Sequence, residues 1–369
     1  MLSNFDRPIE IVYNSCPFEA LAAGRILGYI FPSLNTAELY RLGNYPVFLP
    51  HILLGLLITV FFTWLNYRGV RASARFLKFT TFSFLSLVIF FALAGAERGS
   101  LANLHPLFSH APLISILLVW QVVPWLLSGF ESVVKCVEEA SPDFHHENFS
   151  VAIILTIFSG LLFFWVVIFA VSFVAPRSSL NINLQFPTAM AFERALHAHW
   201  IVDLILASAL LALLQAFNGN MMAASRLLFA MGRRNLVFPR MCLIHPVNQT
   251  PSMAIFAVGV GTLFATFLGE AGLVPILEVG AVACAVGWMS ACASYYCLEP
   301  NLTGRLAALF GVFVTLVMVL VKLLPIVPGH FTRYEWLAMG IWALLGFLVR
   351  IRANQQSSST QERVPAGEI

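Results

Sequence analysis

Long apolar runs separated by short polar stretches dominate the pattern along the chain. Because about 20 consecutive apolar residues are needed for a helix to cross a bilayer, we predict ten membrane segments. They cover residues 13–32, 48–67, 76–95, 113–140, 149–175, 200–231, 252–269, 272–297, 303–327 and 335–351. Continuous apolar runs differ from the alternating pattern of an outer-membrane barrel. Helices, not strands, are therefore expected to cross the membrane.

The predicted segments divide the chain into three parts. Residues 1–12 form an N-terminal segment, which lacks the charged-then-apolar layout of a signal peptide. Residues 13–351 form one multi-pass transmembrane domain. Residues 352–369 are polar and poor in apolar side chains, so we expect a disordered cytoplasmic tail.

The first predicted segment is less regular than the others. Asn14, Pro17, Glu19 and Arg25 interrupt its apolar residues. Ionisable side chains inside a bilayer usually face protein or a water-filled cavity, because exposing a charge to lipid is costly. We therefore expect this helix to face protein instead of lipid.

The composition agrees with a membrane location. Hydrophobic residues make up 59% of the chain and charged residues 11%, and the mean hydropathy is +0.83. These values indicate an integral membrane protein. The net charge of +3 is spread over the loops, which argues against a nucleic-acid partner. The six cysteines show no CxxC spacing, so neither a zinc site nor a disulfide framework is indicated.

The distribution of basic residues predicts the orientation in the membrane. If the first segment runs from the cytoplasm to the exterior, fourteen Lys and Arg residues lie on the cytoplasmic side and six on the outer side. The cytoplasmic set is Arg7, Arg68, Arg71, Arg75, Lys78, Lys135, Arg226, Arg233, Arg234, Arg240, Arg305, Arg350, Arg352 and Arg363. This bias follows the positive-inside rule and places both termini in the cytoplasm. The sequons at Asn148, Asn248 and Asn301 would then be out of reach of glycosylation.

An ionisable residue stands beside a predicted break in the fourth segment. The stretch VVPWLLSGFESVVK contains Pro124, Ser128, Gly129 and Glu131. Proline removes a main-chain donor, glycine loosens the helix, and serine competes for main-chain carbonyls. We therefore expect an unwound turn near residues 127–131. Irregular backbone at membrane depth is tolerated where it lines a cavity, and many secondary transporters build their substrate sites this way.

A second interpretation of the same stretch stays open. A helix kinked by proline and glycine is common in membrane bundles, where neighbouring helices stabilise it. Glu131 lies four residues before Lys135, which is the spacing of a simple helical ion pair. Glu138 and Glu139 are expected at the cytoplasmic mouth, as solvated or gate-pairing residues and not as substrate ligands.

Other polar residues give weaker signals. His145, His146 and Glu147 are adjacent, unlike the HExxH spacing of a helical zinc site, so we expect no metal. Asp203 and Glu278 lie near the outer ends of predicted helices, where each could snorkel to the interface.

Catalytic chemistry is not indicated. The predicted membrane segments hold neither a nucleophile paired with a base nor a metal motif, so we do not expect an enzyme. Arg226 follows the positive-inside bias and is interpreted as a cytoplasmic anchor.

Three motifs carry a resemblance to a known family. They are NYRGVRASARF, SGFESVVKCVEEA, and NGNMMAASRLLFAMGRRNLVFPRM followed by HPVNQTPSMA. In this order and spacing they resemble the amino acid permeases of the amino acid–polyamine–organocation (APC) superfamily, over residues 13–351. The resemblance implies an all-α integral membrane bundle built around an inverted repeat, as in leucine-transporter-like proteins. It also implies that the predicted break belongs to the sixth helix of that family.

The resemblance leaves two helices without a counterpart. Members of the family have twelve helices, and the ten segments predicted here resemble the third to the twelfth. The family's first helix carries a Gly-rich unwound segment that receives the substrate's carboxylate, and nothing in residues 1–47 matches it. Some proton-coupled members have a lysine in the fifth helix. The corresponding position here is Phe84, and Lys78 lies six residues earlier.

The implied function is secondary active transport of amino acids or related amines across the plasma membrane by alternating access. We expect the substrate site at Trp125, Ser128, Gly129, Phe130 and Glu131, where main-chain groups would bind the polar end of the substrate and an aromatic ring would close the cavity. Either a proton or a sodium ion could drive transport, and no cofactor is expected. The alternative is an N-terminally truncated permease homologue that does not transport by itself or serves as a partner subunit.

Overall fold

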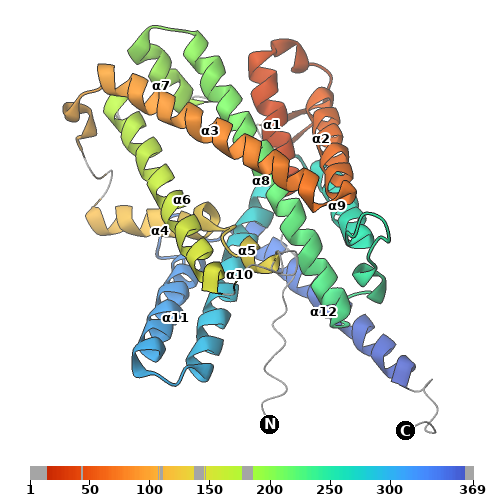
Figure 1. Cartoon of the computed structure of the whole chain (residues 1–369). Helices are drawn as coiled ribbons and strands as arrows, with labels where there is room; N and C mark the ends of the chain where they lie inside the picture. The colour runs from red at the N-terminus through yellow and green to blue at the C-terminus, as the bar shows by residue number, and fades with distance from the viewer. Residues whose placement is uncertain are drawn as a thin grey trace.

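The computed structural model is a bundle of helices with a small two-stranded hairpin (Figure 1). It describes residues 15–42, 45–106, 108, 111–136, 145, 147–176 and 186–361. In chain order the elements are α1 (Cys16–Ile30), β1 (Glu38–Leu42), β2 (Tyr45–Phe48), α2 (Leu49–Arg68), α3 (Val70–Arg98), α4 (Pro112–Leu127), α5 (Ser132–Lys135), α6 (Glu147–Val174), α7 (Pro187–Leu196), α8 (Trp200–Arg233), α9 (Ser252–Thr266), α10 (Gly269–Leu298), α11 (Leu302–Leu323) and α12 (Arg333–Gln361). Short 3-10 helices follow α1, α3 and α8.

Each predicted membrane segment contains a helix of the structure. The fourth segment is divided between α4 and α5, as the predicted break requires. Within the described ranges, seven helical stretches are long and apolar enough to cross a membrane. They are α2, α3, the stretch from α4 to α5, α6, α8, α10 and α11. α1 and α9 have only 15 residues each, and α12 is not among the seven stretches. That these three helices cross the membrane stays a prediction.

The first element that the sequence did not predict is the hairpin. β1 pairs with β2 in antiparallel register, with Tyr40 opposite Val47. Val47 is buried in a cluster with Leu21, Ile52 and Leu273, and Tyr40 packs against that cluster. The hairpin therefore packs against the first turns of α2 and α10, beside Leu21 of α1. Its strands are short and mostly exposed, so the hydrophobic pattern of this stretch does not distinguish strands from a loop.

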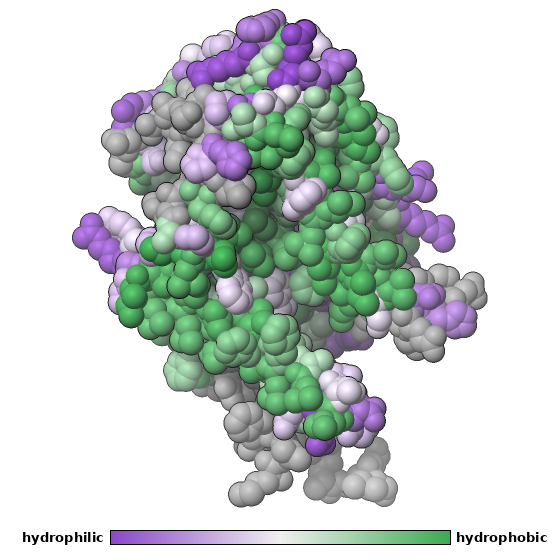
Figure 2. Space-filling model, turned by 90° about the vertical axis from the view of Figure 1, so that its left-hand side faces the viewer, coloured by the Kyte–Doolittle hydropathy of each residue, from purple (hydrophilic) through white to green (hydrophobic). Residues whose placement is uncertain are grey.

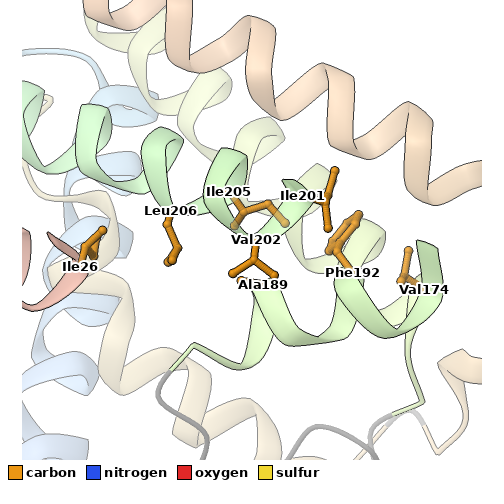
Figure 3. Close-up of a cluster of buried hydrophobic side chains, with 8 residues drawn as sticks. All are labelled: Ile26, Val174, Ala189, Phe192, Ile201, Val202, Ile205 and Leu206. Atoms are coloured by element: carbon orange, nitrogen blue, oxygen red, sulfur yellow. The ribbon is translucent and has the colours of Figure 1, made fainter. Parts of the chain in front are cut away.

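The second unpredicted element is α7. One face of this helix presents Ala189 and Phe192 to Ile201 of α8 and Val174 of α6 (Figure 3). His197 has a left-handed conformation with φ 51° and ends the helix before α8 begins. Because α7 is short and apolar on one face only, a search for long apolar runs passes over it.

The C-terminal helix extends further than the sequence predicted. α12 continues to Gln361, past the predicted end of the last membrane segment at residue 351. Over residues 352–361 the structure is therefore helical where disorder was expected. Adding one residue to an existing helix costs much less than starting one, so a helix begun in apolar sequence can run on into polar sequence. Residues 362–369 and 1–12 lie outside the described residues, and the predictions for them are untested.

Helix α1 is surrounded by protein. It packs against α2, α8, α9 and α10, and ten of its 15 residues are buried. Ile26 joins the cluster with α6, α7 and α8 that Figure 3 shows. Cys16 and Ala20 join a second cluster with α2, α8 and α9, and Leu21 belongs to the cluster under the hairpin. This burial confirms that the first predicted segment faces protein.

The tight turn between α2 and α3 contacts the loop between α8 and α9. Gly69 makes this turn with φ 131°, a conformation that residues with a side chain rarely adopt. Tyr67 Oη lies 3.0 Å from His245 Nε2, and the Thr250 hydroxyl donates to the Tyr67 carbonyl at 3.1 Å. Two loops that the sequence predicted on one side of the membrane therefore touch.

Buried amide and hydroxyl groups join α2, α3 and α8. Asn66 Nδ2 and Ser73 Oγ both donate to Asn218 Oδ1, at 2.9 and 3.0 Å. All three side chains are at most 1% exposed. Because buried polar groups are costly unless they are hydrogen-bonded, this network fixes the arrangement of the three helices.

The outer surface is strongly apolar. Large apolar side chains are exposed along α2, α3, α6, α11 and α12. Figure 2 shows a broad hydrophobic surface over the middle of one face, with hydrophilic residues gathered at its upper end. Monomeric soluble proteins rarely expose apolar patches larger than a few hundred Å². The surface is that of an integral membrane protein whose middle faces lipid tails.

Candidate functional site

The helix between α4 and α5 unwinds where the sequence predicted a break. Pro124 lies inside α4 and cannot donate a main-chain hydrogen bond. The amide of Ser128 still donates to the Pro124 carbonyl at 3.2 Å, and α4 ends there. Gly129 then takes φ 117°, a backbone conformation that residues with a side chain rarely adopt. Residues 128–131 form turns, and α5 begins at Ser132.

The side chain of Glu131 spans this unwound turn. Its Oε2 atom accepts a hydrogen bond from the amide of Gly129 at 2.8 Å, and its Oε1 atom lies 3.4 Å from Lys135 Nζ. The break and the helical ion pair, which the sequence left as alternative interpretations, therefore occur together. The carboxylate binds the glycine amide and the lysine at once.

Part of the main chain at the break remains available. The Ser128 hydroxyl donates to the Trp125 carbonyl at 3.0 Å, and the amides of Ser128 and Gly129 are already bonded. Among the residues that the structure describes, the amides of Phe130 and Glu131 have no hydrogen-bond partner. The sequence placed the freed main-chain groups around Ser128, Gly129 and Phe130, and the free donors of the structure are those of Phe130 and Glu131.

The break lies on the wall of a large cavity. The cavity has a volume of about 1960 Å³, and Trp125, Ser128, Gly129, Phe130 and Glu131 all line it. The structure therefore brings the five predicted site residues together on one surface. A side chain added at Gly129 would meet nothing within 4 Å, so the backbone here is open to the cavity.

An aromatic pair lies beside the break. The ring centroids of Phe130 and Trp288 are 5.2 Å apart, and both residues line the cavity. Trp288 belongs to α10, far along the chain, and the sequence interpretation did not select it. Trp125, which was expected to help close the cavity, is 47% exposed.

A polar cluster on another part of the cavity wall was also missed. Asn220 of α8 donates to Ser15 Oγ and to Glu19 Oε1, each at 2.7 Å. Ser15 Oγ also donates to Glu19 Oε1 at 2.9 Å. Ser15, Glu19 and Asn220 all line the cavity. The signal in the sequence was Glu19 itself, an ionisable residue within a predicted membrane segment.

An ion pair joins α1 to α10. Arg25 Nη1 lies 2.9 Å from Glu270 Oε1, and the Arg25 guanidinium lies 5.9 Å from the centre of the Phe186 ring. Arg25 and Phe186 line the cavity. This contact explains how a charged residue is accommodated in α1.

The structure adds a partner for one charged residue and corrects the interpretation of another. Glu278, which could snorkel to the interface, has a side chain that is 35% exposed, and its Oε2 atom lies 2.6 Å from Nζ of Lys322 on α11. Arg226 was interpreted as a cytoplasmic anchor, but it is 5% exposed and donates to Ser225 Oγ at 2.9 Å. Lys322 becomes the partner of Glu278 only through the packing of α11 against α10, which local sequence cannot reveal.

The remaining candidates contribute little to the site. Phe84 lines the cavity, and its ring centroid lies 5.1 Å from that of Phe163. Glu138, Glu139 and His146 lie outside the described residues. Across the described part of the chain, no group of three or more His, Cys, Asp or Glu residues could hold a metal ion.

A broken helix and a largely apolar cavity with a few polar groups on its wall, inside a bundle of apolar helices, are the features of a membrane carrier. The family model described as amino acid permease matches residues 16–348. The chain therefore belongs to the amino acid permease family of the APC superfamily, which is a family of transporters and not of enzymes. A comparison with curated proteins gives no match.

Proposed function

We propose that the chain carries amino acids or related amines by alternating access and binds them at the break between α4 and α5. The observation that carries this proposal is the pair of free amides, at Phe130 and Glu131, on the wall of the cavity. Main-chain donors without partners can bind the carboxylate of an amino acid or the polar end of a related molecule. Ser128 and Gly129 line the same wall.

The apolar part of the substrate would lie against the aromatic rings of the cavity. Phe130 and Trp288 form a pair at the break, and Trp125 lies one turn before it. Pockets that bind small molecules combine an apolar lining with a few polar groups that fix the orientation of the ligand. An amino acid fits this combination because its polar groups lie at one end.

We further propose ten crossings, with both termini in the cytoplasm of a plasma-membrane protein. The contact between the α2–α3 turn and the α8–α9 loop supports this orientation, because both carry several arginines. Positive residues gather on the cytoplasmic side. Cysteine labelling from each side of the membrane, at Asn248 and at Arg41, would test it, because the two positions are predicted on opposite sides.

Transport by the purified chain is the experiment that tests the proposed function. The chain would be reconstituted in liposomes and loaded with a mixture of the common amino acids, and counterflow of each labelled amino acid or amine would be measured. We expect counterflow of at least one of them, together with a rise in the thermal unfolding temperature when it is added. A properly inserted chain that shows neither for any compound would contradict the proposal.

A second candidate function is favoured by the size of the cavity. Its volume of about 1960 Å³ exceeds the 300 to 1,000 Å³, roughly, of most small-molecule sites. Further apolar helices or a partner subunit would reduce it to the size of one substrate. The chain would then be a truncated permease homologue, or a subunit, that does not transport by itself.

The two candidates predict different native proteins. A native mass well above 40.8 kDa, or a stable partner that restores counterflow, would favour the second candidate. Counterflow by the isolated 369-residue chain would favour the first.

A further inference from the structure

Glu19 is a buried carboxylate without a counter-ion. It is 8% exposed, and it forms no ion pair within the ranges that the structure describes. Its Oε1 atom accepts hydrogen bonds from Ser15 Oγ and Asn220 Nδ2. Its Oε2 atom is fully buried and has no hydrogen-bond partner among the described residues.

Two opposing effects act on this group. Burying a carboxylate away from water disfavours its charged form, whereas hydrogen bonds from two donors favour it. A buried charge without a cation is costly. Binding or losing one positive charge at the Glu19 carboxyl therefore changes the free energy of this buried site strongly.

A proton fits this site better than a metal cation. Oε2 is not accessible to a water molecule, whereas a proton needs no additional space. The neighbouring groups, Ser15 Oγ and Asn220 Nδ2, donate hydrogen bonds to Glu19. A sodium ion needs oxygen atoms that coordinate it, and these two groups already point donors toward the carboxylate.

The other charged and titratable groups near Glu19 contact residues other than Glu19. On α1 these are Cys16, whose thiol donates to the Phe217 carbonyl at 3.4 Å, and Arg25, which pairs with Glu270 of α10. α2 carries His51, which packs against Gly24 and Gly28. α8 carries Arg226, which binds Ser225. α9 has no titratable residue. Across the cavity, Lys135 pairs with Glu131.

We propose that Glu19 takes up and releases the proton that drives transport, with Ser15 and Asn220 stabilising its ionised form. On uptake, a proton from water forms an O–H bond with the carboxylate and removes its charge, and on release that bond breaks and the charge returns. This inference rests on the proposed transport function.

The location of the cluster links the proton to the substrate cavity. Asn220 lies on α8, and its hydrogen bonds to Glu19 and to Ser15, which directly precedes α1, hold the two helices together. Protonation removes the charge that these donors stabilise and weakens the contact between α1 and α8. Both helices line the cavity that holds the break, so the arrangement of its walls depends on the proton.

Infrared spectroscopy of the full chain in lipid tests protonation without a substrate. The pH is changed, and the carbonyl stretch of protonated carboxyl groups is followed in the wild type, in Glu19→Gln and in Glu97→Gln, an exposed control on α3. We expect a buried-carboxyl band that titrates in the wild type and in the control and is lost in Glu19→Gln. A band that persists in Glu19→Gln would overturn the assignment.

If Glu19→Gln does not fold, Ser15→Ala answers the same question. This small change removes one donor to Oε1, so the midpoint of the band must shift, and an unchanged midpoint would overturn the proposal.

Proton flux tests coupling. Liposomes that contain the wild type and a trapped pH dye receive a mixture of the common amino acids, with or without sodium. We expect amino-acid-driven proton entry that is independent of sodium, retained in Glu97→Gln and reduced to the level of empty liposomes in folded Glu19→Gln. Sodium-dependent uptake without proton entry would overturn the proton assignment. Absence of wild-type counterflow would instead reject the proposed function, while the infrared band would still test protonation of Glu19.

Discussion

The carboxylate of Glu131 reaches back across the unwound turn to the amide of Gly129, with 2.8 Å between Oε2 and the amide nitrogen. The same carboxylate lies 3.4 Å from Lys135 Nζ in α5. One side chain therefore connects the glycine of the break to the helix that follows. This relationship satisfies a main-chain donor that helix formation would otherwise have paired.

Replacing Glu131 separates its two roles. Glu131→Ala removes the acceptor for the Gly129 amide, and we expect it to lower the free energy of unfolding by about 1 to 2 kcal/mol. Glu131→Gln keeps an acceptor oxygen and loses only the charge, so its effect should be less than half as large. Unfolding of the two variants in denaturant is the measurement. Equal losses of stability would show that the ion pair with Lys135, and not the amide contact, holds the turn.

Gly129→Ala tests the backbone of the break without adding a clash. The φ of 117° is strained for alanine, whereas the new methyl group would meet nothing within 4 Å. We expect a loss of about 1 to 2 kcal/mol in stability and a fall in counterflow, because the turn would lose its shape. Gly160→Ala inside α6 is the matched control: a methyl group there also meets nothing within 4 Å. It should leave counterflow unchanged and should not lower stability, because alanine favours a helix more than glycine does. A Gly129→Ala chain as active and stable as the control would contradict the account.

The aromatic pair beside the break should contribute to substrate affinity. Phe130→Ala removes the ring that lies 5.2 Å from Trp288, and such pairs contribute about 0.5 to 1.5 kcal/mol beyond their buried area. We expect the apparent KM for counterflow to rise by roughly 2- to 10-fold. Phe130→Tyr keeps the ring and should behave like the wild type. A KM unchanged in Phe130→Ala would place the apolar part of the substrate elsewhere.

A pH-dependent contact lies outside the membrane segments. His199 Nδ1 lies 2.6 Å from Glu193 Oε1 on α7, and this hydrogen bond together with the charge of Glu193 raises the pKa of His199. A raised pKa means that the contact stabilises the fold fully below the unfolded pKa of about 6.5. The stabilisation is lost as the pH rises through the higher folded pKa.

Histidine-selective NMR titration measures this contact directly. Glu193→Gln should lower the pKa of His199 toward the ordinary value, whereas Glu38→Gln on β1, a carboxylate that pairs with Arg41, should leave it unchanged. An identical His199 titration in the wild type and in Glu193→Gln would show that the two side chains do not interact in solution.

Local features of the fold and site could be predicted from the sequence. The break follows from Pro124 and Gly129, whose effects act on their own stretch of backbone. The apolar runs predicted the positions of the long helices because bilayer thickness sets the length of a crossing. The burial of α1 could be predicted because its charged residues are incompatible with lipid.

Features that depend on distant contacts could not be predicted. Asn220 and Glu19 are separated by 201 positions, and only packing of α1 against α8 brings them together. The same holds for Phe130 with Trp288 and for Glu278 with Lys322. The hairpin and α7 were missed because each is short and buries only one face against the bundle.

Amide hydrogen exchange at the break tests the central claim most directly. The full chain in lipid is exposed to heavy water with and without a saturating mixture of the common amino acids, and the peptide that contains residues 128–131 is compared with one from the middle of α11. We expect slower exchange of the Phe130 and Glu131 amides when amino acids are present, and no change in α11. Unchanged exchange at the break, in a chain that performs counterflow, would contradict binding at these amides.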